Sequence, residues 1–404
     1  MSTVITRRGP RQLIEGEGTL PGVGLLASEL GRRVLVVSDP IIIEQPGYAE
    51  VMAALDEAGL EVETFVDPAR EAPLEVVERC ASRAIDCRAD LLVAVGGGTV
   101  LDVAKAAAVL VTHGGQPGDY YGENQVPGAV LPIIAIPTTA GTGSEVTTVA
   151  VLSDPERILK VGISSVYLMP TFSICDPRMT YTCPPTVTAY AGIDAVCHAV
   201  EAYTAVRRSY GWREVVEGVF VGKNPVSDEY ALKALHLLNS SLVAAVEHGD
   251  DTDARAAVMR GATAAGVAFG HAGTAGPHAL QYPVGAATKT PHGLGVGLLL
   301  PYVLTRNKPL IQQELVELAT CIGLEADDGD SAEAFIEWTV ELAARIGVPV
   351  SLREIGVERT QLRWLAEEAV GVTRLLQNNP GDNSVEGLEA ILNAAWEGDR
   401  DRLR

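Results

Sequence analysis

The chain has 404 residues, 47% of them hydrophobic and 21% charged, which is typical of a globular protein long enough for two domains. Its 52 acidic residues outnumber its 31 basic residues, so the formal net charge is -21. We therefore expect neither nucleic acid nor an anionic membrane as a partner, because both require a basic surface.

The six cysteines include no C-x-x-C pair and are too few for a disulfide framework, which indicates a reducing compartment. The first ten residues contain arginines but no apolar stretch, so no signal peptide is expected. Every long apolar run is broken by glycine, proline or charge before it reaches membrane-spanning length. These observations predict a cytoplasmic protein.

The first half of the chain alternates short apolar runs with segments of helical spacing. This alternation predicts right-handed βαβ units and a mostly parallel sheet, with ligands at the carboxyl ends of its strands. The expected strands cover residues 33–38, 60–65, 91–95 and 129–136, and the expected helices cover 48–59, 73–87 and 100–111.

The second half, from about Pro184, changes to long helical segments. Ser227 and Asp228 are candidate capping residues for one of them, and residues 206–224 interrupt the pattern with three arginines and three aromatic residues. We predict an α/β domain over residues 1–183, followed by an all-helical domain over residues 184–404. The expected helices cover residues 187–205, 227–247, 254–269 and 332–346.

Two glycine-rich loops follow expected strands. Gly96-Gly97-Gly98-Thr99 opens a helix, so its glycines allow close approach of a pyrophosphate and the helix offers free N–H groups. The loop is not G-x-G-x-x-G, and a tight turn without a ligand is the alternative. Residues 137–147 place five hydroxyls and two glycines after the next strand. The two loops together favour a phosphate-bearing cofactor.

Asp39 directly follows the strand expected over residues 33–38. A carboxylate there can accept hydrogen bonds from an adenosine ribose and repels a 2′-phosphate, which favours NAD over NADP. An Asp–Pro turn without a ligand is the alternative.

The second half contains a candidate metal site. Asp194 and His198 are four residues apart and therefore lie on one helical face, and His278 and His292 come later in glycine-rich sequence. One carboxylate and three imidazoles suit a divalent transition metal. Each histidine taken singly is equally compatible with a core or capping position.

The motifs in this order resemble those of the iron-containing (group III) alcohol dehydrogenases over nearly the full length of the chain. They are Gly96 to Thr99 with Asp102 and Lys105, the 137–147 loop, the 192–202 segment and the 278–293 stretch. The resemblance implies an N-terminal NAD-binding α/β domain, a C-terminal helical metal-binding domain and a homodimer.

On matching positions, the resemblance assigns the metal ligands and the residues that face the dinucleotide. The metal ligands are Asp194, His198, His278 and His292. The cofactor-binding residues are Asp39, Gly97, Gly98, Thr99, Thr138, Thr139, Thr142 and Lys160, to which we add Asp102 of the same motif.

The chain departs from the family pattern at several positions. Tyr282 stands where a second histidine is thought to relay the proton, so Tyr282, His271 or bulk water takes this role, or Tyr282 only shapes the pocket. Residues 206–224 are similar to an insertion in the hydroxyacid–oxoacid transhydrogenase branch. Their arginines either meet an anionic substrate or pair with surface acids. Glu71 replaces an asparagine common near the adenine-side loop.

The resemblance implies an NAD-dependent, metal-dependent dehydrogenase that interconverts a small alcohol and its aldehyde. The alcohol–aldehyde pair includes anionic ones that carry a carboxylate, phosphonate or sulfonate. The expected metal is Fe(II), ahead of Zn(II) or Ni(II). One alternative is a hydroxyacid–oxoacid transhydrogenase that retains its nucleotide. The others are a dehydroquinate synthase-type lyase and a non-catalytic binding protein.

Overall fold

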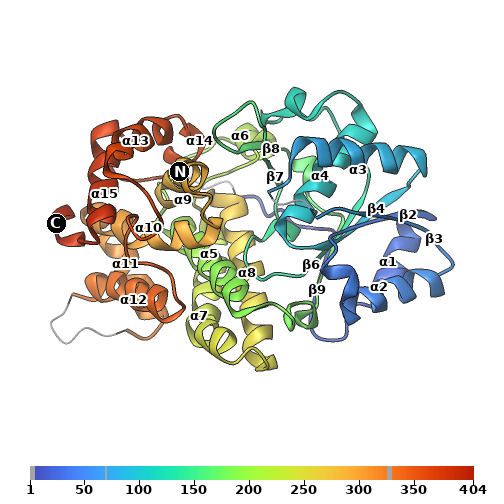
Figure 1. Ribbon diagram of the computed structural model, residues 1–404, viewed down its shortest axis with the longest axis horizontal. Helices are drawn as coiled ribbons and strands as arrows, with labels where there is room; N and C mark the ends of the chain where they lie inside the picture. Colours follow the sequence, from blue (N-terminus) through green and yellow to red (C-terminus); the bar gives the residue numbers. More distant parts are fainter. Residues whose placement is uncertain (1–4, 69–70, 325–329) are drawn as a thin grey trace. The chain divides into compact units, whose positions relative to one another are not determined.

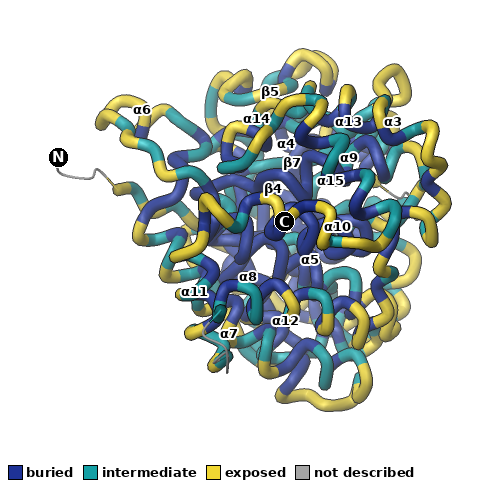
Figure 2. Tube along the Cα trace, turned by 90° about the vertical axis from the view of Figure 1, so that its left-hand side faces the viewer, coloured by how far each residue is buried: buried dark blue, intermediate teal, exposed yellow. Residues whose placement is uncertain are grey.

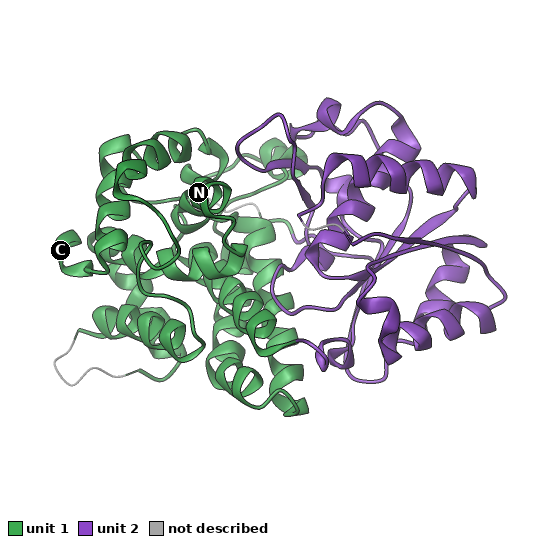
Figure 3. Ribbon diagram, in the orientation of Figure 1, with its two compact units in different colours: residues 1–6, 184–404 green, residues 7–183 purple. Residues whose placement is uncertain are grey.

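The computed structural model describes residues 5–68, 71–324 and 330–404. The chain forms two compact units (Figure 3). Residues 7–183 make the α/β unit, and residues 184–404 together with Ile5 and Thr6 make the helical unit. Within the described part of the chain, no helix has the length and apolar character needed to cross a membrane.

A six-stranded sheet in which all neighbouring strands are parallel forms the centre of the α/β unit (Figure 1). The strand order is β1-β9-β6-β4-β2-β3, which confirms the prediction of a mostly parallel sheet. The strands are β1 (Gln12–Glu15), β2 (Arg33–Ser38), β3 (Glu61–Val66), β4 (Leu91–Gly96), β6 (Ile133–Pro137) and β9 (Phe172–Cys175).

Helices cover both faces of this sheet, which explains why the central strands read as continuous apolar runs. Val34 and Val36 face the core formed with α1 and α2, whereas Leu35 and Val37 face the core formed with α3 and α4. The helices are α1 (Gly22–Leu30), α2 (Pro46–Glu57), α3 (Leu74–Asp86) and α4 (Gly98–His113).

Several strands of this unit were not predicted from the sequence. The outer strand β1 and its neighbour β9 have four residues each, and the second sheet, in the order β5-β8-β7, has strands of two to four. Segments this short show no clear periodicity. The strand expected over 129–136 begins only after Pro132, which has no N–H to donate to a ladder. The second sheet consists of β5 (Gly122–Glu123), β7 (Val149–Leu152) and β8 (Val161–Ser164).

The helical unit is built around α5 (Pro185–Thr204), which is buried along most of its length (Figure 2). α5 is buried because it packs against α7, α8 and α10, although one of its faces carries polar residues. The other helices are α6 (Trp212–Glu217), α7 (Pro225–Glu247), α8 (Thr252–Ala272), α9 (Gly276–Thr288), α10 (His292–Asn307), α11 (Gln312–Cys321), α12 (Ser331–Arg345), α13 (Leu362–Val370), α14 (Thr373–Leu376) and α15 (Val385–Glu397).

The start of α7 differs from the expected one. Asn224 caps this helix by accepting hydrogen bonds from the N–H groups of Val226 and Ser227, and Pro225 is its first residue. Ser227 contributes through its hydroxyl, which accepts the Asn224 N–H. The prediction of Ser227 and Asp228 as the capping residues was therefore wrong by three and four positions, because Asn224 followed by proline is the stronger start signal.

Candidate functional site

Three helices of the helical unit bring one carboxylate and three imidazoles together. Asp194 and His198 lie one turn apart on α5, His278 lies in the first turn of α9, and His292 is the first residue of α10. The Nε2 atoms of His198, His278 and His292 lie 3.8, 3.5 and 3.8 Å from Asp194 Oδ1. His198 Nε2 and His278 Nε2 are 3.1 Å apart. The structure thus places all four predicted ligands in one cluster.

The donor spacing of Asp194, His278 and His292 fits a single metal ion, and His198 Nε2 lies near the first two of these donors. Ligand atoms about 2.1 Å from a tetrahedral ion lie about 3.4 Å from one another, close to the separations in this cluster. The donor atoms of Asp194, His278 and His292 all lie within 4.8 Å of one another. Asp194 Oδ1 is buried and accepts no hydrogen bond from the described residues, although a buried acceptor normally has a partner. A bound cation would supply this partner.

The cluster shifts the ionisation of its own members. Burial raises the pKa of Asp194, but His198, His292 and His278 outweigh this effect and hold it below its usual range. Burial lowers the pKa of His278, but the carboxylates of Glu201 and Asp194 raise it to about 9. A negative charge is therefore kept at the centre of the imidazoles.

Glu201 on α5 belongs to this site and was missed in the sequence analysis. Its Oε2 atom accepts a hydrogen bond from His278 Nδ1, and its Oε1 atom accepts the N–H groups of Ala275 and His278 at 2.9 and 3.3 Å. The available signal was spacing, since Glu201 follows Asp194 by seven residues and His198 by three on one helical face.

Close packing of α10 against α5 sets the position of His292. A Cβ atom at Gly293 would lie 1.9 Å from the Tyr190 carbonyl oxygen, and one at Gly297 would lie 2.6 Å from the Ile193 side chain. Only glycine permits this separation. His292 precedes Gly293 and is held at the cluster with a side chain that remains 33% exposed.

Aromatic side chains border the cluster. The Phe269 ring stacks on His198 with centroids 4.1 Å apart, and the Tyr282 ring centroid lies 6.3 Å from that of His292. His271 Nδ1 bonds to the Val267 carbonyl of its own helix at 2.7 Å. Of the two proton-relay candidates, Tyr282 thus has a ring contact with the cluster, and His271 turns one ring nitrogen toward its own backbone.

In the α/β unit, both predicted glycine-rich loops lie at the carboxyl ends of adjacent strands. Gly96 at the end of β4 pairs with Pro137 at the end of β6, so the two loops lie side by side. A Cβ atom at Gly98 would lie 2.7 Å from the Thr142 side chain. The glycine at position 98 is thus required by the packing of one loop on the other.

The α4 N-terminus lies within this pair of loops. Its N-cap is Gly97, which has no side chain to bond to the first N–H groups of the helix. Gly98 and Thr99 are in the first turn. Thr138 is buried, whereas Thr139 and Thr142 are partly exposed. These residues form a loop pair with helix N–H groups, which is the arrangement that binds phosphate.

Asp102 and Lys105 on α4 hold the second loop in place. Asp102 accepts hydrogen bonds from the Ser144 hydroxyl at 2.7 Å and the Val151 N–H at 3.0 Å. The fully buried Lys105 ammonium donates to the carbonyls of Ser144, Thr147 and Val149. Burial lowers the pKa of Lys105 to about 8. Asp102 therefore binds the loop through the Ser144 hydroxyl and binds β7 through the Val151 N–H.

The remaining predicted cofactor residues lie at the surface of the same unit. Asp39 Oδ1 accepts the N–H groups of Ile41 and Ile42, as in the Asp–Pro turn considered above. Lys160 Nζ lies 3.3 Å from Glu71 Oε1, so the unusual Glu71 pairs with a predicted cofactor ligand.

The arginines of the 206–224 insertion all have partners. Arg207 pairs with Asp228 at 2.8 Å, and Arg208 donates to the Gln377 carbonyl and to the Asn378 side chain. Arg213 lies 3.8 Å from Glu217. This pattern agrees with the reading in which the arginines pair with neighbouring surface groups.

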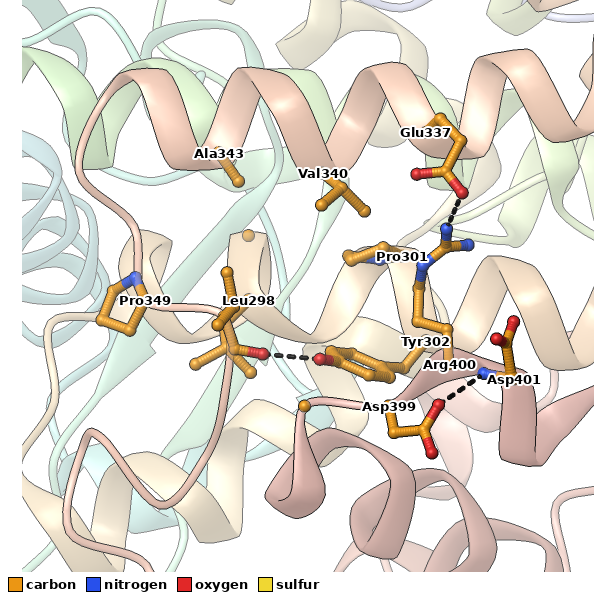
Figure 4. A pocket seen from close by; sticks show the side chains of 13 residues that line it. Leu298, Pro301, Tyr302, Glu337, Val340, Ala343, Pro349, Asp399, Arg400 and Asp401 are labelled. Atoms are coloured by element: carbon orange, nitrogen blue, oxygen red, sulfur yellow. Dashed lines mark hydrogen bonds and ion pairs between the residues drawn. The ribbon is translucent and has the colours of Figure 1, made fainter.

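A separate pocket of about 370 Å³ lies between α10, α12 and residues 398–401 (Figure 4). Its polar groups bind each other, since Arg400 pairs with Glu337 and the Tyr302 hydroxyl donates to the Val350 carbonyl. None of Asp194, His198, His278 and His292 lines this pocket.

Comparisons with known proteins give the same family for both parts of the chain. Residues 10–177 match the family described as iron-containing alcohol dehydrogenase, and residues 213–396 match the C-terminal part of the Fe-containing alcohol dehydrogenase family. Long-chain-alcohol dehydrogenase 1 of Geobacillus thermodenitrificans is 36% identical over 373 residues, covering 91% of this chain and 90% of the relative.

Solved structures agree with this result. A 1,3-propanediol oxidoreductase superimposes with a TM-score of 0.90 at 29% identity, covering 97% of this chain and all of the other. A sulfoacetaldehyde reductase from Bifidobacterium kashiwanohense, in complex with NAD+, superimposes with a TM-score of 0.83 at 28% identity. The match covers 98% of this chain and 99% of the other. This chain therefore belongs to the iron-containing (group III) alcohol dehydrogenase family of oxidoreductases.

Proposed function

We propose that this enzyme interconverts a small alcohol and its aldehyde, with NAD(H) as hydride carrier and one divalent ion held by Asp194, His198, His278 and His292. The observation that carries the proposal is the 3.1–3.8 Å spacing of the donor atoms around the buried Asp194 Oδ1. Fe(II) follows from the family, and the same donors accept Zn(II) or Ni(II).

When bound, the ion supplies Lewis-acid polarisation of the substrate oxygen, and the nicotinamide carries the hydride. The protein supplies the surroundings of this chemistry. Asp194, His198 and His278 are at least 95% buried, which limits access of water, and His292 forms the more exposed side. The Tyr282 hydroxyl is proposed to move the proton between the substrate oxygen and solvent.

The α/β unit is proposed to bind the dinucleotide at the two loops. The N–H groups at the start of α4 suit the pyrophosphate, and the hydroxyls of Thr138, Thr139 and Thr142 suit neighbouring polar groups. The Asp39 carboxylate lies at the end of β2 and disfavours the 2′-phosphate of NADP. We also propose that the protein is cytoplasmic and forms a homodimer. Light scattering during gel filtration tests the oligomeric state.

An uncharged aldehyde is the favoured substrate class, because all three arginines of the insertion have protein partners. The similarity to a sulfoacetaldehyde reductase supports including anionic aldehydes in the test. Among the described residues, no contact favours the transhydrogenase alternative.

The test is loss of NADH absorbance by metal-stripped protein reloaded with Fe(II), Zn(II) or Ni(II), with a panel of neutral and anionic aldehydes. Turnover that requires metal, prefers NADH to NADPH and disappears in Asp194→Asn supports the proposal. His236→Ala, a histidine outside the cluster, serves as the control. Absence of turnover with every metal and aldehyde overturns it, and exchange between hydroxyacids and ketoacids without free NADH identifies a transhydrogenase.

A further inference from the structure

We propose that Glu201 is a positioning residue of the metal site, which keeps the proton of His278 on Nδ1 and thereby presents the Nε2 lone pair to the ion. This inference rests on the proposed metal site and goes beyond it, because Glu201 is not itself a ligand. It assigns a function to a buried carboxylate that the ligand set leaves unexplained.

The geometry around Glu201 is specific for this role. The side chain is 2% exposed and is directed at the first turn of α9. Its Oε2 atom binds His278 Nδ1, while its Oε1 atom receives the N–H groups of Ala275 and His278. One carboxylate therefore holds both the backbone and the ring of the same ligand residue.

The chemistry of the carboxylate sets the tautomer. An ionised carboxylate only accepts hydrogen bonds, so the His278 nitrogen that faces Glu201 must carry a proton. The other nitrogen, Nε2, faces Asp194 Oδ1 at 3.5 Å and His198 Nε2 at 3.1 Å, where the ion would bind. Hydrogen bonding at the second ring nitrogen commonly orients metal-binding histidines and increases their basicity.

The fold explains how one helix does this for a ligand on another. Asp194, His198 and Glu201 lie on one face of α5, and the turn before α9 brings His278 to that face. α5 thus provides two ligands directly and orients a third from α9. Loss of Glu201 alone is expected to leave all four ligand side chains present but to remove the preference for the binding tautomer.

Glu201→Gln separates tautomer control from simple packing. The amide has nearly the same size, and its oxygen can still accept the two backbone N–H groups. Its NH₂ group, however, donates to His278 Nδ1, which forces the proton of a neutral ring onto Nε2. Glu317→Gln is the matched control, because Glu317 accepts a hydrogen bond from the Tyr203 hydroxyl and has no contact with the cluster.

The measurements are Zn(II) affinity by chelator competition, the visible absorption of the Co(II)-loaded protein and thermal unfolding of the metal-free protein. We expect Glu201→Gln to weaken Zn(II) binding by about 10–100-fold and to alter the Co(II) spectrum, while a cooperative thermal transition shows that the metal-free variant is still folded. Glu317→Gln should match the wild type. Wild-type affinity and spectrum in Glu201→Gln would overturn the inference.

Nitrogen NMR of histidine-labelled, metal-free protein at pH 10 tests the tautomer directly. The inference expects a proton on Nδ1 of His278 in the wild type and on Nε2 in Glu201→Gln, and the same tautomer in both proteins would overturn it. If the wild type binds no metal at all, the proposed function fails, whereas this NMR comparison still decides the role of Glu201.

Discussion

The Nε2 atoms of His198 and His278 face each other at 3.1 Å, although the two residues are 80 positions apart in the chain. Both nitrogens also lie near the buried Asp194 Oδ1, at 3.8 and 3.5 Å. Two imidazole nitrogens this close can share a proton or bind one cation. The arrangement is therefore suited to a positive charge beside Asp194.

Metal binding is expected to stabilise the protein. A ligand present at one hundred times its Kd adds about 2.7 kcal/mol to the free energy of unfolding. Thermal unfolding with and without Zn(II) should show this increase in the wild type and lose it in Asp194→Asn. Equal metal-induced shifts in both proteins would place the ion elsewhere.

Gly293→Ala is expected to weaken metal binding and destabilise the fold. The new Cβ would lie 1.9 Å from the Tyr190 carbonyl oxygen and 3.0 Å from Asp194 Cβ, so α10 must move away from α5 and carry His292 with it. Overpacking of this kind costs about 1–3 kcal/mol. Denaturant unfolding and metal competition measure both effects. Gly22→Ala in α1, where a Cβ meets no atom within 4 Å, is the control.

Tyr282→Phe separates a proton relay from a shape effect. The ring keeps its place beside His292, at a centroid distance of 6.3 Å in the wild type, while the hydroxyl is lost. We expect kcat to fall by about 100-fold with unchanged metal affinity, and Tyr282→His to restore part of it. An unchanged kcat would leave the relay to His271 or water, and His271→Gln then distinguishes the two.

Replacing Arg207, Arg208 and Arg213 together by alanine tests the charge of the substrate. Because these side chains pair with Asp228, the Gln377 carbonyl and Glu217, we expect the ratio of kcat/KM for anionic and neutral aldehydes to stay the same. Steady-state kinetics with matched aldehydes measures this ratio. A selective loss for the anionic aldehydes would show that the insertion recognises their charge.

Arg178→Met is expected to destabilise the α/β unit in a pH-dependent way. Burial raises the pKa of Asp176, but Arg178 outweighs it, so the pKa of this fully buried carboxyl lies below its ordinary value. The ionised carboxyl contributes stability above its unfolded pKa of about 3.9, and this contribution is lost as pH falls through the folded pKa.

Loss of the arginine leaves a buried charge and should cost about 3 kcal/mol at pH 7. The difference in unfolding free energy between wild type and variant should become smaller toward pH 4, as Asp176 becomes protonated in the variant. Urea unfolding of both proteins at pH 7 and pH 4 measures this difference. Arg363→Met, which removes a surface arginine bound to three carboxylates, should leave stability unchanged. A deficit independent of pH would contradict the assignment to Asp176.

Local sequence patterns predicted the parallel sheet and the helical second half. The runs at residues 34–37 and 91–95 are apolar throughout because both sides of β2 and β4 are covered, and such runs are visible without tertiary information. The spacing of Asp194 and His198 is likewise local, because one helical turn places both on one face. The short strands β1, β5 and β7 show no comparable periodicity and were missed.

Tertiary structure decided everything that depends on segments distant in the chain. The sequence by itself marked His278 and His292 as candidate ligands, but only the packing of α9 and α10 on α5 brings their Nε2 atoms to Asp194. The spacing of Glu201 on α5 was a local signal, but its role follows from its partner on α9, and that of Gly98 from the approach of Thr142. Helical spacing constrains neighbours within a few turns, whereas contacts between helices follow from close packing, which no local pattern encodes.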